Sequence, residues 1–178
     1  SIFSESIKTI RTNLAFSAIG NEMKVLLATS PAAGDGKSFI SANLAVAYAQ
    51  EGKKVLMIDC DLRRGRQHEL FAPENSHLFA AIGSALNYKE DVNLGKYIMK
   101  TSNANVDLLP TGPTPPNPIE LLASENNQKL LNELRKLYDI IILDCPPVIG
   151  LSDTMIMTKF SDANIIVVSN KKTKIESL

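Results

Sequence analysis

The sequence predicts an α/β fold in which a mainly parallel sheet is covered by helices on both faces. Short aliphatic runs of strand length alternate with longer segments whose apolar residues recur at helical spacing. These runs are nearly continuous in Val, Ile and Leu, which is typical of strands buried on both faces. A glycine-containing loop and several aspartates follow directly after the runs, at the strand ends where open α/β sheets bind ligands.

In the first half of the chain we expect two helices and two strands. Apolar residues at helical spacing predict a helix from Ser4 to Ile19, with Ser4 as its cap. The run VLLA over residues 25–28 has the length of a strand, and residues 39–50 have a helical pattern that Gly52 closes. The run KVLMI, residues 54–58, predicts a second buried strand.

The second half contains further strands and helices in alternation. We expect short helical pieces over residues 62–105, a weak strand over 105–110, a proline-rich connection over 111–118, helices over 119–138 and 152–161, and core strands over 139–144 and 163–169. The last predicted strand lies close to the end of the sequence. We therefore expect the fold to lack its C-terminal end.

Composition and charge indicate one ordinary globular domain over residues 1–178. Lys plus Arg equal Asp plus Glu at 19 each, so no overall field favours nucleic acid or an anionic membrane. No apolar run approaches the roughly 18 to 20 residues of a membrane span, and the N-terminus lacks the pattern of a signal peptide. Two cysteines do not form a disulfide framework. We expect a cytoplasmic protein in a reducing environment.

The stretch SPAAGDGKS ends like a phosphate-binding loop, although Pro31 stands where the pattern G-x-x-x-x-G-K-[ST] has its first glycine. Gly34 and Gly36 permit positive φ, so that successive backbone N–H groups can surround a phosphate at the positive end of the following helix. Lys37 can reach the β and γ oxygens, and the Ser38 hydroxyl is a candidate Mg²⁺ ligand. The alternative is an ordinary strand-to-helix turn.

Three carboxylates also follow predicted strands. Asp59 and Asp61 are two residues apart, and in an extended segment such residues point the same way. A bound cation relieves the repulsion between neighbouring buried carboxylates. Asp144 follows an aliphatic run, as the acid of a Walker B motif does. For Asp59 and Asp61 the alternative is a capping role or an ion pair with Arg63 or Arg64.

Together these motifs resemble the bacterial tyrosine kinases (BY-kinases) of capsular and exopolysaccharide biosynthesis. The resemblance rests on SPAAGDGKSFISANLAVAYAQEGKKVLMIDCDLRRG, LLPTGPTPPNPIELLAS and YDIIILDCPPVIGLSD, and it covers nearly the whole chain. It implies the three-layer P-loop NTPase fold that this family shares with the partitioning ATPases. The family tolerates proline at the position of Pro31.

The resemblance assigns phosphoryl transfer from Mg-ATP to tyrosine, in trans within an oligomer. It implies a Walker A motif at Lys37 and Ser38, a Walker A′ motif at Asp59 and Asp61, and a Walker B motif at Asp144. Asp59, or alternatively Asp61, would accept the proton of the tyrosine hydroxyl. The predicted site residues are Lys37, Asp59 and Asp61 for catalysis, Ala33, Gly34, Asp35, Gly36, Lys37, Ser38 and Phe39 for nucleotide binding, and Ser38, Asp59 and Asp144 for Mg²⁺.

The resemblance also implies partners. Glu5, Lys8 and Arg11 fit the family's E-x-x-R-x-x-R self-association motif, with Lys at the middle basic position. We therefore divide the chain into a self-association helix, residues 1–20, and a nucleotide-binding core, residues 21–178. The implied partners are further copies in a ring, a membrane-anchored polysaccharide co-polymerase that recruits the kinase to the inner face of the cell membrane, and a cognate tyrosine phosphatase. Nucleic acid is not among them.

One feature of the family is missing from this sequence. Family members typically end in a tyrosine-rich cluster, whereas this sequence ends in NKKTKIESL and its tyrosines, Tyr48, Tyr88, Tyr97 and Tyr138, are scattered. Tyr48 and Tyr138 lie in helical patterns, and we expect them to be packing residues. Cys60 and Cys145 each follow a predicted site aspartate. We expect packing at the edge of the core for both cysteines, with a redox role as the alternative.

Two other functions remain open from the sequence. A Min/Par-type switch ATPase would use water as the acceptor, but such proteins usually have a second lysine near the start of the loop, and residues 31–35 contain none. An assembly module would bind nucleotide without transferring its phosphate.

Overall fold

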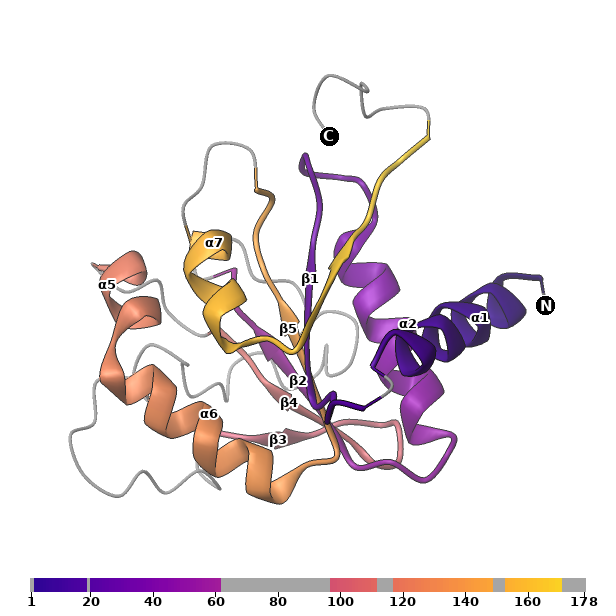
Figure 1. The fold of residues 1–178 in the computed structure, drawn as a ribbon, viewed down its shortest axis with the longest axis horizontal. Coiled ribbons are helices and arrows are strands. Elements are labelled where there is room, and N and C mark those ends of the chain that lie inside the picture. The colour runs from indigo at the N-terminus through magenta and orange to yellow at the C-terminus, as the bar shows by residue number, and fades with distance from the viewer. Residues whose placement is uncertain (1, 19, 62–96, 112–116, 149–152, 171–178) are drawn as a thin grey trace.

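The computed structural model describes residues 2–18, 20–61, 97–111, 117–148 and 153–170 (Figure 1). Over these residues the strand order of the sheet is β3-β4-β2-β5-β1-β6. Every pairing is parallel except that of β3 with β4. The elements are α1 (Ile2–Ser17), β1 (Val25–Thr29), α2 (Lys37–Ala49), β2 (Val55–Asp59), β3 (Met99–Lys100), β4 (Val106–Leu109), α5 (Pro118–Ala123), α6 (Glu125–Leu137), β5 (Ile140–Asp144), α7 (Asp153–Met157), η3 (Thr158–Phe160) and β6 (Ala163–Ile166). The predicted α/β fold is confirmed.

Helices cover both faces of the sheet, with α1 and α2 on one side and α5, α6 and α7 on the other (Figure 1). Side chains of a strand alternate between the two faces, so neighbouring residues enter different cores. Leu26 and Met57 belong to the core cluster with α1 and α2. Leu27 and Ile58 belong to the cluster with α5, α6 and α7. This double burial explains why the strands read as continuous aliphatic runs.

Two local predictions are wrong. The helix expected over residues 119–138 is divided into α5 and α6 at Ser124, whose backbone is extended and whose Oγ accepts a hydrogen bond from the N–H of Asn127 at 3.2 Å. Ser124 therefore ends one helix and caps the next. The first helix begins at Ile2, so Ser4 lies inside its first turn and is not its cap.

The segment predicted as short helical pieces is described only in part. Residues 62–96 lie outside the described residues, and Met99–Lys100 forms the antiparallel edge strand β3, which the sequence did not indicate. Among the described helices, none combines the length and the hydropathy needed to cross a bilayer.

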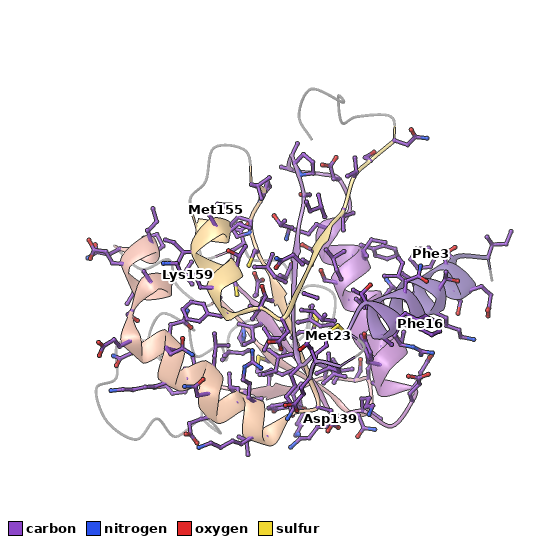
Figure 2. The ribbon with its side chains drawn as sticks, viewed as in Figure 1. Phe3, Phe16, Met23, Asp139, Met155 and Lys159 are labelled. Carbon is purple, nitrogen blue, oxygen red and sulfur yellow. The ribbon has the colours of Figure 1, made fainter. Side chains whose placement is uncertain are left out.

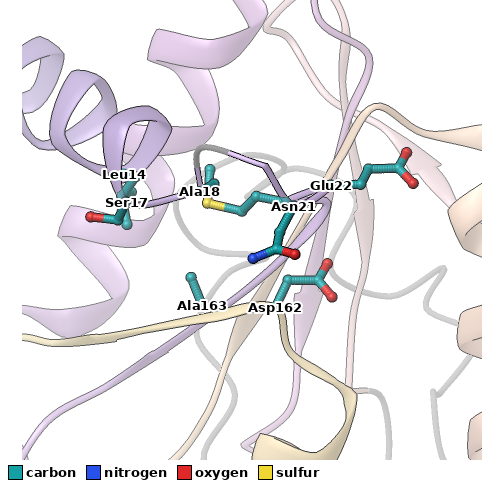
Figure 3. Close-up of a pocket in the computed structure, with 8 residues that line it drawn as sticks. Leu14, Ser17, Ala18, Asn21, Glu22, Asp162 and Ala163 are labelled. Carbon is teal, nitrogen blue, oxygen red and sulfur yellow. The ribbon is translucent and has the colours of Figure 1, made fainter.

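Asp162 links the amino-terminal end of β1 to α6 through hydrogen bonds. Its Oδ2 accepts the N–H groups of Lys24 and Val25 at 2.9 and 2.8 Å, and Arg135 of α6 donates to its Oδ1 at 2.9 Å. Burial raises the pKa of Asp162, but the hydrogen bonds from Arg135 and the two N–H groups outweigh it and hold the pKa below its usual range. Figure 3 shows Asp162 beside Ala163 in a pocket at this end of the sheet, opposite the carboxyl ends of the strands.

Two buried tyrosines, both only 5% exposed, differ in how their hydroxyl groups are satisfied. Tyr138, which follows α6, donates its hydroxyl to the buried carboxylate of Asp107 at 2.7 Å. The Tyr48 hydroxyl of α2 has no hydrogen-bond partner among the described residues. Burial raises the pKa of Tyr48 to about 12, with a smaller lowering by Arg11 and a smaller rise from Glu51. Both tyrosines are packing residues, as predicted.

We expect Asp162→Asn to flatten the pH dependence of stability in acid. Because the folded pKa of Asp162 is depressed, its contribution is complete above the unfolded pKa of about 3.9 and is lost as the pH falls through the lower folded value. Urea unfolding at pH 7, 4 and 3 measures this. The wild type should lose more free energy of unfolding below pH 4 than Asp162→Asn, and Arg135→Gln should reduce the loss in the same way. Equal losses in all three proteins would contradict this role for Asp162.

We expect the two tyrosines to respond oppositely to removal of the hydroxyl. Tyr48→Phe removes an unsatisfied buried group and should raise the free energy of unfolding by about 1 kcal/mol. Tyr138→Phe leaves the buried Asp107 without one of its hydrogen-bond donors, so it should lower the free energy of unfolding by about 1 to 2 kcal/mol. Urea denaturation followed by circular dichroism measures both values, and a change of the same sign in the two variants would contradict the assignment.

Candidate functional site

The candidate site lies at the carboxyl ends of three adjacent strands, β1, β5 and β2 (Figure 1). The strand register places Ala28 of β1 opposite Asp144 of β5, and Asp144 opposite Asp59 of β2. The loop that follows β1 leads directly into α2, which begins at Lys37. Three motifs that are far apart in the sequence therefore meet at one edge of the sheet.

The loop has the backbone of an anion cradle. Gly34 and Gly36 both have φ of +88°, and a Cβ added to either would meet no heavy atom within 4 Å. The backbone conformation therefore requires glycine at both positions, and the space beside the two Cα atoms is open. Gly36 is the N-cap of α2 and has no side chain to cap the first-turn N–H groups, which are thus suited to a phosphate. Asp35 stabilises the turn, because its Oδ2 accepts the N–H of Ala32 at 3.1 Å.

The proline in the loop is compatible with this geometry. Within the described part of the loop the positive φ angles occur at Gly34 and Gly36 and not at Pro31, which is buried. Proline fixes φ near −65°, so it suits a position that needs no positive φ. Ser30 and Thr29 attach this part of the loop to the segment after β5. Val148 donates its N–H to the Ser30 carbonyl at 2.9 Å, and the Thr29 hydroxyl donates to the Pro146 carbonyl at 2.8 Å.

Lys37 and the two strand-end aspartates are brought together in a buried cluster. The Lys37 Nζ lies 2.5 Å from Asp144 Oδ1 and 3.2 Å from Ser38 Oγ. The side chains of Lys37 and Asp144 are 9% and 1% exposed, and Asp59 is fully buried. Charges at this depth are tolerated only when they are paired. The ammonium of Lys37 therefore offsets the charge of the aspartate cluster.

Asp61 and Phe39 differ from the rest of the predicted site. Asp61 is partly buried, and its N–H donates to Asp59 Oδ1 at 3.2 Å, which fixes the orientation of that carboxylate. The side chain of Phe39 is turned toward α1, where its ring centroid lies 5.4 Å from that of Phe3, and Phe39 remains 52% exposed. Only the backbone of Phe39 belongs to the first turn after the loop. Arg63 and Arg64 lie outside the described residues.

Thr29 and Thr154 connect parts of the site, although neither is among the predicted site residues. Their hydroxyls both donate to the carbonyl of Pro146, at 2.8 and 2.6 Å, and so attach the phosphate loop and α7 to the segment after Asp144. No pattern in the sequence distinguishes these threonines from others. They connect these segments only because the fold places both hydroxyls beside the Pro146 carbonyl.

The two cysteines are neighbours in the structure. Cys60 and Cys145 directly follow the paired residues Asp59 and Asp144, and both are fully buried. Hydrogen bonding with Cys145 raises the pKa of Cys60 well above its usual value, and burial raises it further. A high pKa disfavours the reactive thiolate. These observations favour packing over redox chemistry.

The predicted metal ligands suit Mg²⁺, which shares its ligands with a bound nucleotide, better than they suit a metal ion that is bound by protein side chains alone. No group of three His, Cys, Asp or Glu residues suited to a metal ion occurs in the part of the chain that the structure describes. The set of Ser38, Asp59 and Asp144 offers one hydroxyl and two carboxylates instead. Mg²⁺ is typically held by one or two carboxylates, with substrate phosphates and water completing its shell.

Comparisons with known proteins agree with this geometry. A family model described as an AAA domain, AAA_31, matches residues 23–178. The chain is 39% identical over 176 residues to the tyrosine-protein kinase YwqD of Bacillus subtilis (strain 168), with 99% of this chain and 72% of that protein covered. It is also 39% identical over 173 residues to the putative tyrosine-protein kinase CapB of Staphylococcus aureus, with 97% and 73% covered.

Solved structures show the same fold. The crystal structure of the chimerical protein CapA2B2 is similar with a TM-score of 0.89 and 35% identity, over 99% of this chain and 76% of that chain. The septum site-determining protein MinD of Pyrococcus horikoshii OT3, complexed with Mg-ADP, has a TM-score of 0.65 and 26% identity, over 81% and 57%. The fold and the loop define a P-loop nucleotide-binding protein.

Within that class, the chain belongs to the bacterial tyrosine-protein kinases. The predicted family and the predicted enzyme class, a protein-tyrosine kinase, are confirmed.

Proposed function

We propose that this chain transfers the γ-phosphoryl group of Mg-ATP to tyrosine hydroxyls of a neighbouring copy, and that the reaction regulates the synthesis and export of a capsular or exopolysaccharide. The main support for the proposal is that Lys37, Asp59 and Asp144 lie together beside the phosphate loop in a chain of the tyrosine-kinase family. The link to polysaccharide rests on the sequence resemblance.

The phosphates would be held by the loop and by Lys37. Backbone N–H groups around Gly34 and Gly36 suit the phosphate oxygens, and the positive end of α2 favours their charge. The Lys37 ammonium, at the first residue of α2, supplies a full positive charge beside the same anion. Mg²⁺ held by Ser38, Asp59 and Asp144 would neutralise charge on the transferring phosphoryl group. The similar structure of MinD contains Mg-ADP, which supports the binding of a magnesium nucleotide by this fold.

Transfer requires a carboxylate that can meet the incoming tyrosine. The hydroxyl oxygen forms the new bond to the γ-phosphorus, the bond to the β-phosphate oxygen breaks, and the hydroxyl proton passes to a carboxylate. Asp59 is fully buried beside Asp144, which suits a metal ligand, whereas the partly exposed Asp61 is the better-placed proton acceptor. We therefore divide the two roles between Asp59 and Asp61.

The tyrosines that the structure describes are poorly placed to accept phosphate. Among the described residues Tyr48, Tyr97 and Tyr138 are 5%, 8% and 5% exposed, so none offers its hydroxyl to the site. Tyr88 lies outside the described residues. Burial makes these three tyrosines poor acceptors in this copy and in a neighbouring copy alike. Transfer in trans therefore rests on the sequence resemblance.

The outer face of α1 is the proposed contact between copies. Glu5 and Lys8 are exposed and form an i, i+3 ion pair of 3.1 Å. Arg11 instead faces its own α2, where it donates to the Ala47 carbonyl at 3.0 Å and pairs with Glu51. Arg11 therefore holds α1 in place, and Glu5 and Lys8 are the residues of the motif that a neighbour can reach.

Further partners follow from the resemblance. We place the kinase at the cytoplasmic face of the membrane, recruited and activated by a membrane-anchored polysaccharide co-polymerase. A cognate tyrosine phosphatase would reverse the modification.

We expect the site variants to separate chemistry from nucleotide binding. With ATP, Mg²⁺ and a tyrosine-rich peptide, Lys37→Met and Asp59→Asn should each reduce phosphotyrosine formation by at least about 100-fold. Lys37→Met removes the positive charge at the phosphates, and Asp59→Asn removes a charged ligand of the metal. Asp61→Asn should reduce it by about 100-fold while nucleotide affinity changes less than about threefold, because it removes only the base. Asp139→Asn, at the opposite end of β5 (Figure 2), should remain as active as the wild type.

Three outcomes of that assay contradict the proposal in different ways. Phosphate release without phosphotyrosine identifies a Min/Par-type switch ATPase. Nucleotide binding with neither product identifies an assembly module. Full phosphotyrosine formation by Asp61→Asn transfers the role of the base back to Asp59.

We expect α1 to determine the oligomeric state. Glu5→Ala combined with Lys8→Ala should reduce the mass of the assembly measured by light scattering, because it removes the reachable charges of the motif. A matched control is Glu133→Ala combined with Lys136→Ala, which removes an exposed i, i+3 pair of the same kind from α6. An unchanged mass in the α1 variant, or a monomeric wild type at all concentrations, would contradict a ring formed through this helix.

A further inference from the structure

The ammonium of Lys37 lies among the oxygen atoms that the proposed metal site needs. It is 2.5 Å from Asp144 Oδ1 and 3.2 Å from Ser38 Oγ, which belong to two of the three proposed ligands. The third ligand, Asp59, is the register partner of Asp144 on the adjacent strand. One cation of the chain itself therefore contacts the position where a divalent cation would be bound.

We propose that Lys37 is an internal counter-ion that competes with the metal for these oxygens. The metal then binds tightly only after nucleotide phosphates have drawn the Lys37 ammonium away from Asp144. The inference rests on the proposed function, because the ligand set is the one assigned there. It makes Lys37 a residue that couples metal binding to nucleotide binding, in addition to its contact with phosphate.

Electrostatic repulsion between cations favours this competition. Asp144 is 1% exposed and Asp59 is fully buried, so their negative charges need a nearby cation in the folded protein. An ammonium group and a divalent ion that both contact Asp144 Oδ1 repel each other strongly, because two cations then lie within a few ångströms. A metal that takes this oxygen therefore displaces Lys37, and a buried ammonium left without a partner is costly.

The phosphate loop supplies the alternative partner for Lys37. Lys37 is the residue after Gly36, so its side chain starts at the cradle of N–H groups and extends to Asp144. Phosphate oxygens in the cradle offer the ammonium new anionic partners next to its own backbone. Asp144 and Ser38 are then released for the metal. By linkage, the metal raises nucleotide affinity by the same factor as nucleotide raises metal affinity.

Metal titrations of the full chain test the proposal without any turnover. Isothermal titration with Mn²⁺ or Mg²⁺ is carried out with and without a saturating non-hydrolysable ATP analogue. The wild type should bind the metal at least about tenfold more tightly with the analogue than without it. Lys37→Met without the analogue should bind at least about tenfold more tightly than the wild type without it, because the competing cation is gone.

Matched variants separate charge from other effects. Lys37→Arg keeps the competing positive charge and should bind the metal alone as weakly as the wild type. Lys37→Met combined with Asp144→Asn should lose the gain of the single variant, because it removes a ligand. Mg²⁺ should raise the melting temperature of Lys37→Met more than that of the wild type, since only in the variant is the positive charge beside Asp144 Oδ1 missing. Lys37→Gln gives the same comparison if Lys37→Met does not fold by circular dichroism.

The results that overturn this inference differ from those that overturn the proposed function. If the wild type binds metal with the analogue but Lys37→Met alone binds it no more tightly than the wild type alone, Lys37 is no competitor and the ligand set stands. If the wild type binds no metal even with the analogue, the ligand set of Ser38, Asp59 and Asp144 is itself wrong.

Discussion

The register of three parallel strands is the constraint on which the site depends. Ala28, Asp144 and Asp59 lie side by side because β1, β5 and β2 pair in that register. Main-chain hydrogen bonds extend the alignment past the strand ends, from Cys145 N–H to the Ala28 carbonyl and from Cys60 N–H to the Asp144 carbonyl, both at 2.9 Å. A slip of one residue would turn every side chain of a strand to the other face. The backbone therefore positions the carboxylates, and Lys37 compensates their charge.

Helix α2 connects the phosphate loop with the proposed contact between copies. Lys37 is the first residue of this helix. Two residues later, Phe39 packs its ring against Phe3 of α1. Near the other end of α2, the Ala47 carbonyl and Glu51 bind Arg11 of α1. Figure 2 shows Phe3 and Phe16 on α1, at the side of the molecule away from α5 and α6. A neighbour bound to α1 would therefore lie one helix away from the nucleotide.

The sequence predicted those features whose physical cause is local. Aliphatic runs identified the central strands because burial on both faces leaves no polar positions in them, and the glycines of the loop identified the backbone that needs positive φ. Features that depend on tertiary neighbours were not predictable. Helical spacing continues on both sides of Ser124, so the break there was hidden. The direction of Phe39 depends on where α1 packs, and the intramolecular contacts of Arg11 could not be inferred from a motif shared with an interface.

The most direct test of the account is a single-turnover reaction with ATP labelled at the γ-phosphate, a tyrosine-rich acceptor peptide and an excess of this chain. Quenched samples are divided into inorganic phosphate and phosphoamino acids, and both are counted over time. The account predicts that the label lost from ATP is recovered mainly in phosphotyrosine, with matching rates of loss and gain. Recovery of the label in inorganic phosphate alone would contradict it.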